Sequence, residues 1–374
     1  MADIYCDKNG GNDTTGDGSI GNPYATRQKA VDNAGGGDTI YISNDGAQTD
    51  SIDWTTGWGG GTSDTVWLHF KPYDSGGSFT YTLPDGTVID PAFEVDGGDS
   101  LAQPHVATSI PGNVHVEHGY FHNFTTRAMH TGIEWHVHQC RLSHSPDGSN
   151  TANNCQYTEN WVHDMTDDGL LAGAENILKR NYIDSCTGDG IHAGGHEVRI
   201  RDNIIRECTG HGINVTSNWD SVEIIGNTID GTGSAASDRG IKWSSSHGFA
   251  HCYNNIISNY PTTGAYGQEF SATGHFSELG PNFYYNVDTK ALNTPSDVNV
   301  DRTASDVTEA SDPFTNRATG DYTIKSGSTF KAAAHGFADS YEEPGALQRE
   351  EPAGGGGSDT GVAATSIIFG VAFE

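Results

Sequence analysis

The stretch from residue 160 to residue 243 decides the fold, because it reads as four related segments: NWVHDMTDDGLLAGAENILKR (160–180), NYIDSCTGDGIHAGGHEVRIRD (181–202), NIIRECTGHGINVTSNWDSVEIIG (203–226) and NTIDGTGSAASDRGIKW (227–243). The asparagines that open the segments are 21, 22 and 24 residues apart. Each segment later places a glycine before an apolar residue, at Gly169-Leu170, Gly190-Ile191, Gly212-Ile213 and Gly240-Ile241. Short apolar runs that recur at such a period, with turn residues between them, indicate a solenoid.

The apolar runs favour strands over helices, because they are rich in Ile, Val and Tyr and no helix-length 3.6-residue pattern separates them. We therefore predict an all-β chain that forms a single-stranded right-handed parallel β-helix, with one coil per repeat. Buried amides in register hydrogen-bond to one another and to turn backbone. We expect such a ladder at one corner of the coil, built from Asn160, Asn181, Asn203, Asn227 and Asn255.

Composition and charge agree with this fold and exclude some partners. Only 34% of the 374 residues are hydrophobic and 49 are glycine, as many short strands joined by many turns require. The net charge is -30, from 19 Lys and Arg against 49 Asp and Glu. Such a surface repels nucleic acids and anionic membranes, so neither is a predicted partner. A polyanionic substrate would need a local basic patch or a bound cation.

Cysteine usage and the chain ends bear on the cellular location. Six cysteines in a chain of this length do not form a disulfide framework. Cys186 and Cys208 should stack in adjacent coils as buried free thiols, although a disulfide between them is the alternative. Met1 leads directly into a strand-like run, so no signal peptide is predicted, and no stretch reaches the ~20 apolar residues of a membrane span. Export would then require another route or a removed leader, whereas a cytoplasmic or virus-particle location would not. An extracellular or virus-particle location is the favoured expectation.

The chain divides into four predicted parts. Residues 1–44 hold a strand, a loop and an amphipathic helix (24–34) that caps the open end, residues 45–290 form the β-helix, and residues 291–350 form a C-terminal cap. Residues 351–374 are a glycine-rich linker and an apolar tail, 362–373, which would pack on the cap or pair with another subunit.

Two regions offer candidate metal ligands, but no metal site is predicted. The loop 7–21 carries oxygen ligands for Ca²⁺ without the EF-hand spacing, at Asp7, Asn9, Asn12, Asp13 and Asp17. Ordinary turns explain this composition better, so no cofactor is required and Ca²⁺ stays a minor alternative. Eight histidines lie between residues 105 and 144, but their spacing matches no zinc motif, so surface and turn positions are expected.

Polar side chains align when the coils are superposed on the apolar residue that follows the repeat glycine. The column two residues before it holds Asp168, Asp189, His211 and Arg239. The column one residue after it holds Leu171, His192, Asn214 and Lys242. Neighbouring coils lie about 4.8 Å apart, so these columns are lines of side chains on one face. Turn chemistry explains Asp-Gly and His-Gly, but it does not explain two of the few basic residues.

These columns resemble the polygalacturonase family of glycoside hydrolases, within the pectate-lyase-like β-helix superfamily that the N-terminal strand, loop and helix also resemble. The matching motifs, in the family's order, are Thr166-Asp167-Asp168-Gly169, Gly188-Asp189-Gly190-Ile191, Gly210-His211-Gly212-Ile213 and Arg239-Gly240-Ile241-Lys242. The resemblance implies that Asp168 and Asp189 are the acid and base, supported by His211. It also implies that Arg239 and Lys242 hold a substrate carboxylate or hydroxyl.

The chain departs from the family pattern at the paired aspartates, where Asp189 stands alone between two glycines. Asp167 on the preceding coil is the nearby replacement. Glycosidic hydrolysis needs one protonated and one ionised carboxyl group, and we expect Asp189 to be the proton donor. His192 and Asn214 extend the expected substrate contacts. Aromatic residues that would stack on sugar rings are Trp243, Trp219 and Tyr266.

The sequence supports three functional hypotheses. The first is a hydrolase that cleaves glycans, some of them containing uronic acids, by carboxylate catalysis. The second is a polysaccharide lyase, in which Lys242 or Arg239 abstracts the proton beside a uronate carboxylate and Ca²⁺ neutralises that carboxylate. The third is a non-catalytic glycan-binding or structural β-helix, such as a virus-particle protein.

Overall fold

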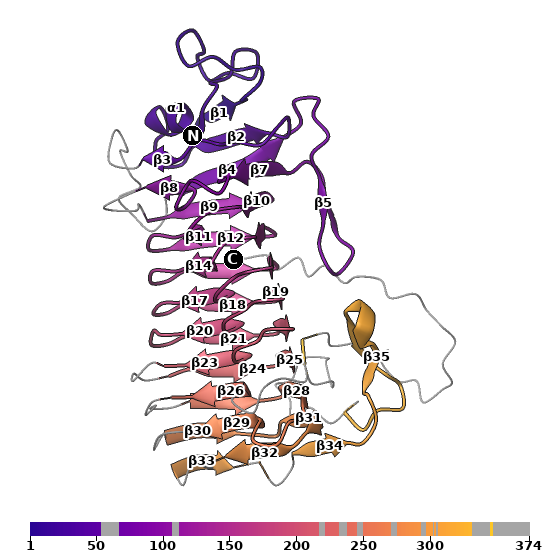
Figure 1. The fold of residues 1–374 in the computed structure, drawn as a ribbon. Coiled ribbons are helices and arrows are strands. Elements are labelled where there is room, and N and C mark those ends of the chain that lie inside the picture. Colours follow the sequence, from indigo (N-terminus) through magenta and orange to yellow (C-terminus); the bar gives the residue numbers. More distant parts are fainter. Residues whose placement is uncertain are drawn as a thin grey trace, which may run out of the picture.

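The computed structural model describes residues 1–53, 67–106, 112–216, 221–231, 238–244, 250–270, 275–292, 297–301, 303, 306–330 and 345–346. Within these ranges the chain winds into a parallel β-helix whose coils stack from the N-terminal end downward (Figure 1). The predicted all-β solenoid is therefore confirmed. The predictions for Trp219, the linker and the 362–373 tail lie outside the described residues.

Three long parallel sheets form the walls of the β-helix. Sheet I contains β1 (Asp3–Cys6), β2 (Thr39–Ser43), β4 (Leu68–Tyr73), β9 (Val114–Glu117), β12 (Trp135–His138), β15 (Gln156–Thr158), β18 (Ile177–Lys179), β21 (Arg199–Arg201), β24 (Glu223–Ile225), β27 (Ala250–Tyr253), β30 (His275–Leu279) and β33 (Asp297–Asp301). Sheet II contains β7 (Phe93–Asp96), β10 (Gly119–His122), β13 (Arg141–Ser143), β16 (Trp161–His163), β19 (Tyr182–Asp184), β22 (Ile204–Arg206), β25 (Thr228–Asp230), β28 (Ile256–Tyr260), β31 (Phe283–Val287) and β34 (Val307–Glu309). Sheet III contains β11 (Arg127–His130), β14 (Asp147–Asn150), β17 (Leu170–Ala172), β20 (Ile191–Ala193), β23 (Ile213–Val215), β26 (Arg239–Trp243), β29 (Tyr266–Phe270) and β32 (Thr289–Leu292).

The remaining strands form pairs outside these walls. They are β3 (Ile52–Asp53) with β8 (His105–Val106), the β5 (Tyr81–Thr82) and β6 (Val88–Ile89) hairpin, and β35 (Phe314–Asn316) with β36 (Asp321–Ile324). The hairpin and the β35–β36 pair stand on the same side of the β-helix, beside sheet II (Figure 1). A short 3₁₀ helix, η2 (Arg317–Thr319), joins β35 to β36.

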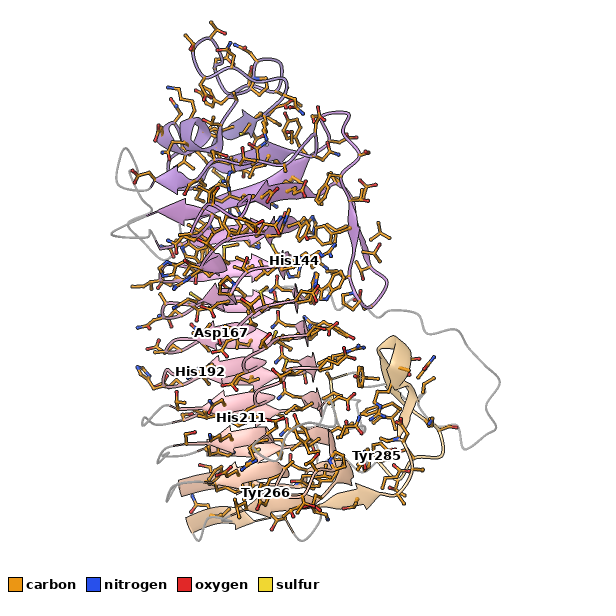
Figure 2. All side chains as sticks on the ribbon, in the orientation of Figure 1. His144, Asp167, His192, His211, Tyr266 and Tyr285 are labelled. Atoms are coloured by element: carbon orange, nitrogen blue, oxygen red, sulfur yellow. The ribbon has the colours of Figure 1, made fainter. Side chains whose placement is uncertain are left out.

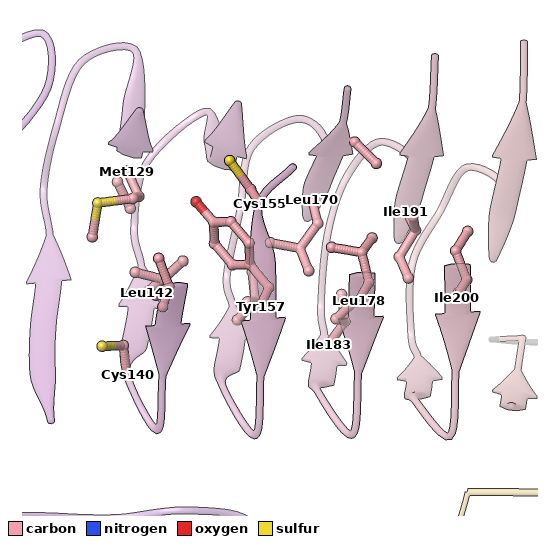
Figure 3. Close-up of a cluster of buried hydrophobic side chains, with 14 of the residues drawn as sticks. Met129, Cys140, Leu142, Cys155, Tyr157, Leu170, Leu178, Ile183, Ile191 and Ile200 are labelled. Atoms are coloured by element: carbon pink, nitrogen blue, oxygen red, sulfur yellow. The ribbon is translucent and has the colours of Figure 1, made fainter. Parts of the chain in front are cut away.

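The core is a narrow column of side chains that alternate inward from all three sheets. Leu170, Ile191 and Ile213 of sheet III stack on one another in register and are fully buried. Leu178 and Ile200 of sheet I face Ile183 and its neighbours across the column (Figure 3). Period-two alternation in short parallel strands produces this packing, because every second side chain points into the column.

The predicted asparagine ladder is confirmed, and it continues one coil further than expected. The amide of each asparagine donates to the next at 2.9–3.0 Å, along Asn160, Asn181, Asn203, Asn227, Asn255 and Asn282. All six are at most 1% exposed. In five of these six turns the residue before the asparagine has a left-handed φ, namely Glu159, Arg180, Asp202, Gly226 and Asn254. The ladder locks the corner between sheets I and II, because each amide also accepts a backbone N–H of the preceding coil.

The repeat glycine before each sheet III strand has a packing reason. A Cβ on Gly169 would come 2.7 Å from the Ile183 side chain and 2.4 Å from the Gly190 carbonyl oxygen. The same crowding recurs at Gly190, where the Ile205 side chain fills the space. The chain therefore enters sheet III in close contact with the core, and the polar residue before each glycine is directed to the outer face.

The N-terminal helix is shorter than predicted. Helix α1 (Arg27–Asp32) begins after Thr26, whose side chain accepts a hydrogen bond from the Lys29 N–H at 3.2 Å. The residues just before it are not helical, because the Asp13 carboxylate accepts hydrogen bonds from the N–H groups of Ala25 and Thr26. The helix packs against β1, β2 and β3 through Ala30 and Val31.

The C-terminal region continues the β-helix and then covers its side. Strands β33 and β34 extend sheets I and II beyond residue 290. Phe314, Tyr322, Ile324 and Phe330 then pack on the outer face of sheet II, against a cluster that includes Ile256. The Tyr322 hydroxyl donates to Asp230 at 2.7 Å and anchors the segment there. The described part of 291–350 thus lies along a wall of the β-helix.

All six cysteines are buried and free, as the preferred interpretation predicted. A hydrogen bond to the Cys208 thiol and then burial raise the pKa of Cys186. Among the described residues, no helix is long and apolar enough to cross a membrane.

Candidate functional site

Two rows of side chains run down the outer face of sheet III. The first row lies at the entry to each strand and contains Arg127, Asp147, Asp168, Asp189, His211, Arg239 and Tyr266. The second row lies three residues further along each strand and contains His130, Asn150, Leu171, His192, Asn214, Lys242 and Glu269. Figure 2 shows Asp167, His192, His211 and Tyr266 following one another down this part of the molecule. Among the described residues, the side chains predicted to share one face therefore do so, except for Trp243.

The aspartates of the first row link one coil to the next. The Asp189 N–H donates to Asp168 Oδ1 at 2.7 Å, and the His211 N–H donates to Asp189 Oδ1 at 2.8 Å. A side chain at Gly188 would collide with Asp168 Oδ1, and a Cβ at Gly210 would lie 2.7 Å from Asp189 Oδ1. This explains the glycine before Asp189: the preceding coil's carboxylate already fills that space.

The second oxygen of each aspartate bonds to the second row. Asp168 Oδ2 lies 3.2 Å from His192 Nδ1, and Asp189 Oδ2 accepts a hydrogen bond from Asn214 Nδ2 at 2.7 Å. The hydrogen bond to Asp168 raises the pKa of His192, while partial burial opposes the rise. Both oxygens of Asp189 therefore accept hydrogen bonds.

Below the aspartates the face becomes basic. Lys242 Nζ lies 3.2 Å from His211 Nε2. Burial lowers the pKa of His211, and Lys242 and Arg239 lower it further against the opposing effect of Asp189. Arg239 is held in place by an ion pair with Glu269, and its guanidinium lies 4.6 Å from the centre of the Tyr266 ring. His211 is therefore a neutral imidazole at neutral pH, beside two cations.

Two further acids belong to the site, and sequence reasoning missed one of them. Burial and the nearby Asp167 carboxylate raise the pKa of Asp147 to about 6, and Arg127 only partly offsets the rise. The pKa of the exposed Asp167 is also raised, by partial burial and by Asp168 and Asp189. The signal for Asp147 was present, because Asp147-Gly148 precedes Asp168-Gly169 by one repeat of 21 residues. It was overlooked because the alignment began at residue 160.

Trp243 corrects the predicted list of substrate contacts. Its side chain is 1% exposed and packs on Phe276, with ring centroids 5.0 Å apart, and on Phe270. The reason is strand alternation: Lys242 points outward, so Trp243 points inward. Among the predicted aromatic residues, Tyr266 remains on the outer face, stacked with Arg239.

The described residues contain two groups with closely spaced ligand atoms. Asp168, Asp189 and His192 place one ligand atom each within 4.8 Å of the others, and so do Glu175, His196 and Glu197 in turns between sheets III and I. In the first group, hydrogen bonds within the protein account for every one of these side chains. The N-terminal loop oxygens likewise accept backbone N–H groups, for example Asp7 from Asn9 and Asp13 from Ala25.

The fold and the outer face define the class of protein: a right-handed parallel β-helix of the pectate-lyase-like type. Within that class, a family model matches residues 113–300, and the chain belongs to this family, described as "Periplasmic copper-binding protein (NosD)". A search of the curated proteins returns no match.

Solved structures similar to this chain share its fold. Pectate lyase Pel9A aligns with a TM-score of 0.56 and 11% identity, over 93% of this chain and 96% of that one. XylC in complex with xylose aligns with a TM-score of 0.54 and 12% identity, over 78% of this chain and 70% of that one. A structure described as a glycoside hydrolase aligns with a TM-score of 0.51 and 9% identity, over 81% of this chain and 97% of that one. At these identities the similarity concerns the fold alone.

The family description names copper, and neither of the two close groups of ligand atoms fits a copper site. Copper sites in proteins are built mainly from imidazole, thiolate and thioether groups. The two close groups of ligand atoms each contain one imidazole and two carboxylates. The six cysteines and Met129 and Met165 are buried in the core. No catalytic step is therefore assigned to copper.

Proposed function

We propose that this chain hydrolyses the glycosidic bonds of a polysaccharide bound along the outer face of sheet III. One observation carries the proposal: two carboxyl groups that lie two coils apart on this face differ in their surroundings. The pKa of Asp147 is raised to about 6, so this group carries a proton in mildly acid solution. Asp189 accepts two hydrogen bonds, at 2.8 and 2.7 Å, and takes the role of the base in this proposal. Glycoside hydrolysis requires this division between acid and base.

The proposed roles differ from those that the family resemblance implied. Asp147 donates the proton to the leaving oxygen, and Asp189, which the sequence suggested as the donor, activates water as the base. Two coil steps separate the rows that carry them, roughly 9–10 Å at about 4.8 Å per strand. That is near the upper end of the ~6.5–9.5 Å typical of inverting enzymes. Asp167 lies exposed between them and contacts substrate, with Lys242 and Arg239 further along the face.

The test is a digestion of a panel of neutral and uronate-containing glycans, with products read by mass spectrometry. Asp147→Asn and Asp189→Asn should each lower kcat by about two or more orders of magnitude, the usual scale of general acid–base catalysis. Lys242→Ala should mainly raise KM, because a cation that holds substrate contributes uniform binding. Activity should fall as pH rises above about 6, where Asp147 loses its proton.

Asp85→Asn is the matched control, because Asp85 is an exposed aspartate in the β5–β6 turn. Its Oδ1 accepts the Thr87 N–H at 2.9 Å, and an asparagine preserves that bond. The proposal is wrong if Asp147→Asn and Asp189→Asn cleave as fast as Asp85→Asn. A parent protein that binds glycans and cleaves none of them would make the chain a binding β-helix.

A second candidate, β-elimination, is favoured by the pair formed by His211 and Lys242. A neutral imidazole 3.2 Å from an ammonium group, with Arg239 on the same coil as Lys242, suits proton abstraction beside a uronate carboxylate held by the cations. Elimination leaves an unsaturated sugar that absorbs ultraviolet light, whereas hydrolysis does not. Loss of activity in Lys242→Ala with little effect of Asp189→Asn, together with that absorbance, would assign the site to a lyase.

A further inference from the structure

A chain of three hydrogen-bonded side chains crosses successive coils on the outer face of sheet III. Asp168 Oδ2 lies 3.2 Å from His192 Nδ1, and His192 Nε2 lies 2.9 Å from Thr216 Oγ1. The three residues come from the entry of β17, from β20 and from the end of β23. They stand in the order carboxylate, imidazole and hydroxyl.

The positions of the protons decide which group in this row donates and which accepts. An ionised carboxylate only accepts hydrogen bonds, so Nδ1 of His192 carries the proton that faces Asp168. In the neutral ring Nε2 is then the acceptor, and the Thr216 hydroxyl donates to it. A hydroxyl that donates to an imidazole, with the imidazole oriented by a carboxylate, is the geometry of an activated oxygen nucleophile. The raised pKa of His192 shows that Asp168 makes the ring more basic.

The next coil contains the same diagonal with one difference. Asp189 Oδ2 accepts from Asn214 Nδ2 at 2.7 Å, and Asn214 Oδ1 accepts from the Ser244 hydroxyl at 3.2 Å. An amide at the middle position therefore makes the same two hydrogen bonds as an imidazole does. An amide, however, cannot take a proton from the hydroxyl. The histidine at position 192 is thus not required by the architecture, and its proton-accepting nitrogen is the feature that needs another explanation.

His192 is 32% exposed and Thr216 is partly exposed. The neighbouring residue on the preceding coil is Gly194, where an added Cβ would still lie 3.9 Å from Thr216 Oγ1. The missing side chain leaves space beside the hydroxyl on the same face that carries the proposed glycan site.

We propose that Thr216, His192 and Asp168 hydrolyse carboxylic esters, with O-acyl substituents of a bound polysaccharide as the substrate class. Thr216 Oγ1 attacks the acyl carbon while His192 Nε2 takes the hydroxyl proton. The tetrahedral intermediate collapses, the bond between the acyl carbon and the sugar oxygen breaks, and His192 gives its proton to that oxygen, which leaves as the sugar hydroxyl. Water then attacks the acyl-threonine with His192 as base, releasing the carboxylic acid and restoring Thr216. Asp168 positions the ring and stabilises its charge.

The test uses p-nitrophenyl acetate, which contains no sugar and no glycosidic bond. Thr216→Val removes the hydroxyl at nearly constant shape and should lower kcat/KM at least about a thousandfold, the usual scale when a nucleophile is lost. Thr216→Ser keeps a hydroxyl and should retain activity within about tenfold. Ser244→Ala, at the equivalent position on the next coil, should match the parent. Circular dichroism on all variants confirms that they are folded.

A second measurement reports the intermediate directly. Mass spectrometry of acid-quenched parent protein should find one acetyl group on the peptide that contains Thr216, and none on that peptide from Thr216→Val. The proposal is overturned if the parent does not hydrolyse the ester above the rate in buffer, or if Thr216→Val is as active as the parent. It stands independently of glycan cleavage, because a protein that cleaves glycans without hydrolysing esters overturns this proposal alone.

Discussion

The asparagine ladder gives the sharpest test of how this β-helix is held together, and Asn203 is the position to change. Asn203 is fully buried, between the coil of Asp189 and the coil of His211. Its Oδ1 accepts the backbone N–H and the side-chain amide of Asn181, both at 2.9 Å. Its Nδ2 donates to the Leu178 carbonyl at 2.9 Å and to Asn227 at 3.0 Å. Asn203→Ala removes all four bonds.

The cost follows from those four bonds. A hydrogen bond contributes a net ~0.5–1.5 kcal/mol, and a buried donor left without an acceptor costs ~1–3 kcal/mol. The backbone N–H of Asn181 becomes such a donor in the variant. The backbone N–H of residue 203 still donates to the Asn227 amide oxygen. We therefore expect Asn203→Ala to lower the free energy of unfolding by about 3–5 kcal/mol. Urea unfolding followed by circular dichroism measures this loss as a shift of the midpoint at constant slope.

Asn153→Ala is the control, because Asn153 is an exposed asparagine at a turn and should change stability by less than ~0.5 kcal/mol. Amide hydrogen exchange adds a local readout, since the Asn181 N–H should exchange faster in Asn203→Ala. A loss below about 1 kcal/mol, with Asn181 still protected, would refute the claim that the ladder carries stability.

Three further predictions concern the site face. Trp243→Leu should lower the free energy of unfolding by about 1–3 kcal/mol through lost core packing. It should leave the KM for any glycan unchanged. A raised KM at unchanged stability would show instead that Trp243 contacts the substrate. Gly188→Ala should destabilise the protein in thermal unfolding, because its Cβ would collide with Asp168 Oδ1, and a melting temperature equal to that of the parent would contradict the crowding. His192→Gln tests linkage: the folded-state pKa of His192 is raised, so its stabilising pair with Asp168 is complete below the unfolded value and is lost as pH rises through the folded one. Its destabilisation should be larger near about pH 5.5 than near about pH 9, and a pH-independent difference would show that the imidazolium does not pair with Asp168.

Asp168 and Asp189 on the outer face of sheet III each make two kinds of hydrogen bond, one to the backbone and one to a side chain. One oxygen of Asp168 and one of Asp189 bind the backbone of the next coil. The other oxygen of each points along the face to His192 or Asn214. Because the structural bond fixes the carboxylate, the second oxygen is presented in one orientation. A site built this way needs no loop movement to become aligned.

The sequence by itself was sufficient to determine the fold. Asparagines at 21 to 24-residue intervals and glycines before apolar residues predict stacked coils, because the constraints they reflect repeat in every coil. The Asn160–Asn255 ladder and the shared face of Asp168, Asp189 and His211 followed from register alone. Register also predicts that Trp243 points inward once Lys242 points outward. That position was misassigned because sugar-stacking chemistry was given more weight than strand alternation.

Only the tertiary structure decided how the candidate site is arranged. Which oxygen of Asp189 meets Asn214, and that His192 reaches back to Asp168 and forward to Thr216, depends on rotamers across three coils that no sequence spacing encodes. The pKa of Asp147 depends on burial and on charges that the fold brings together. The position of 314–324 on the side of sheet II likewise depends on non-local packing on Ile204 and Ile256. A repeating backbone can be predicted because its interactions are periodic, whereas these contacts are individual to each coil.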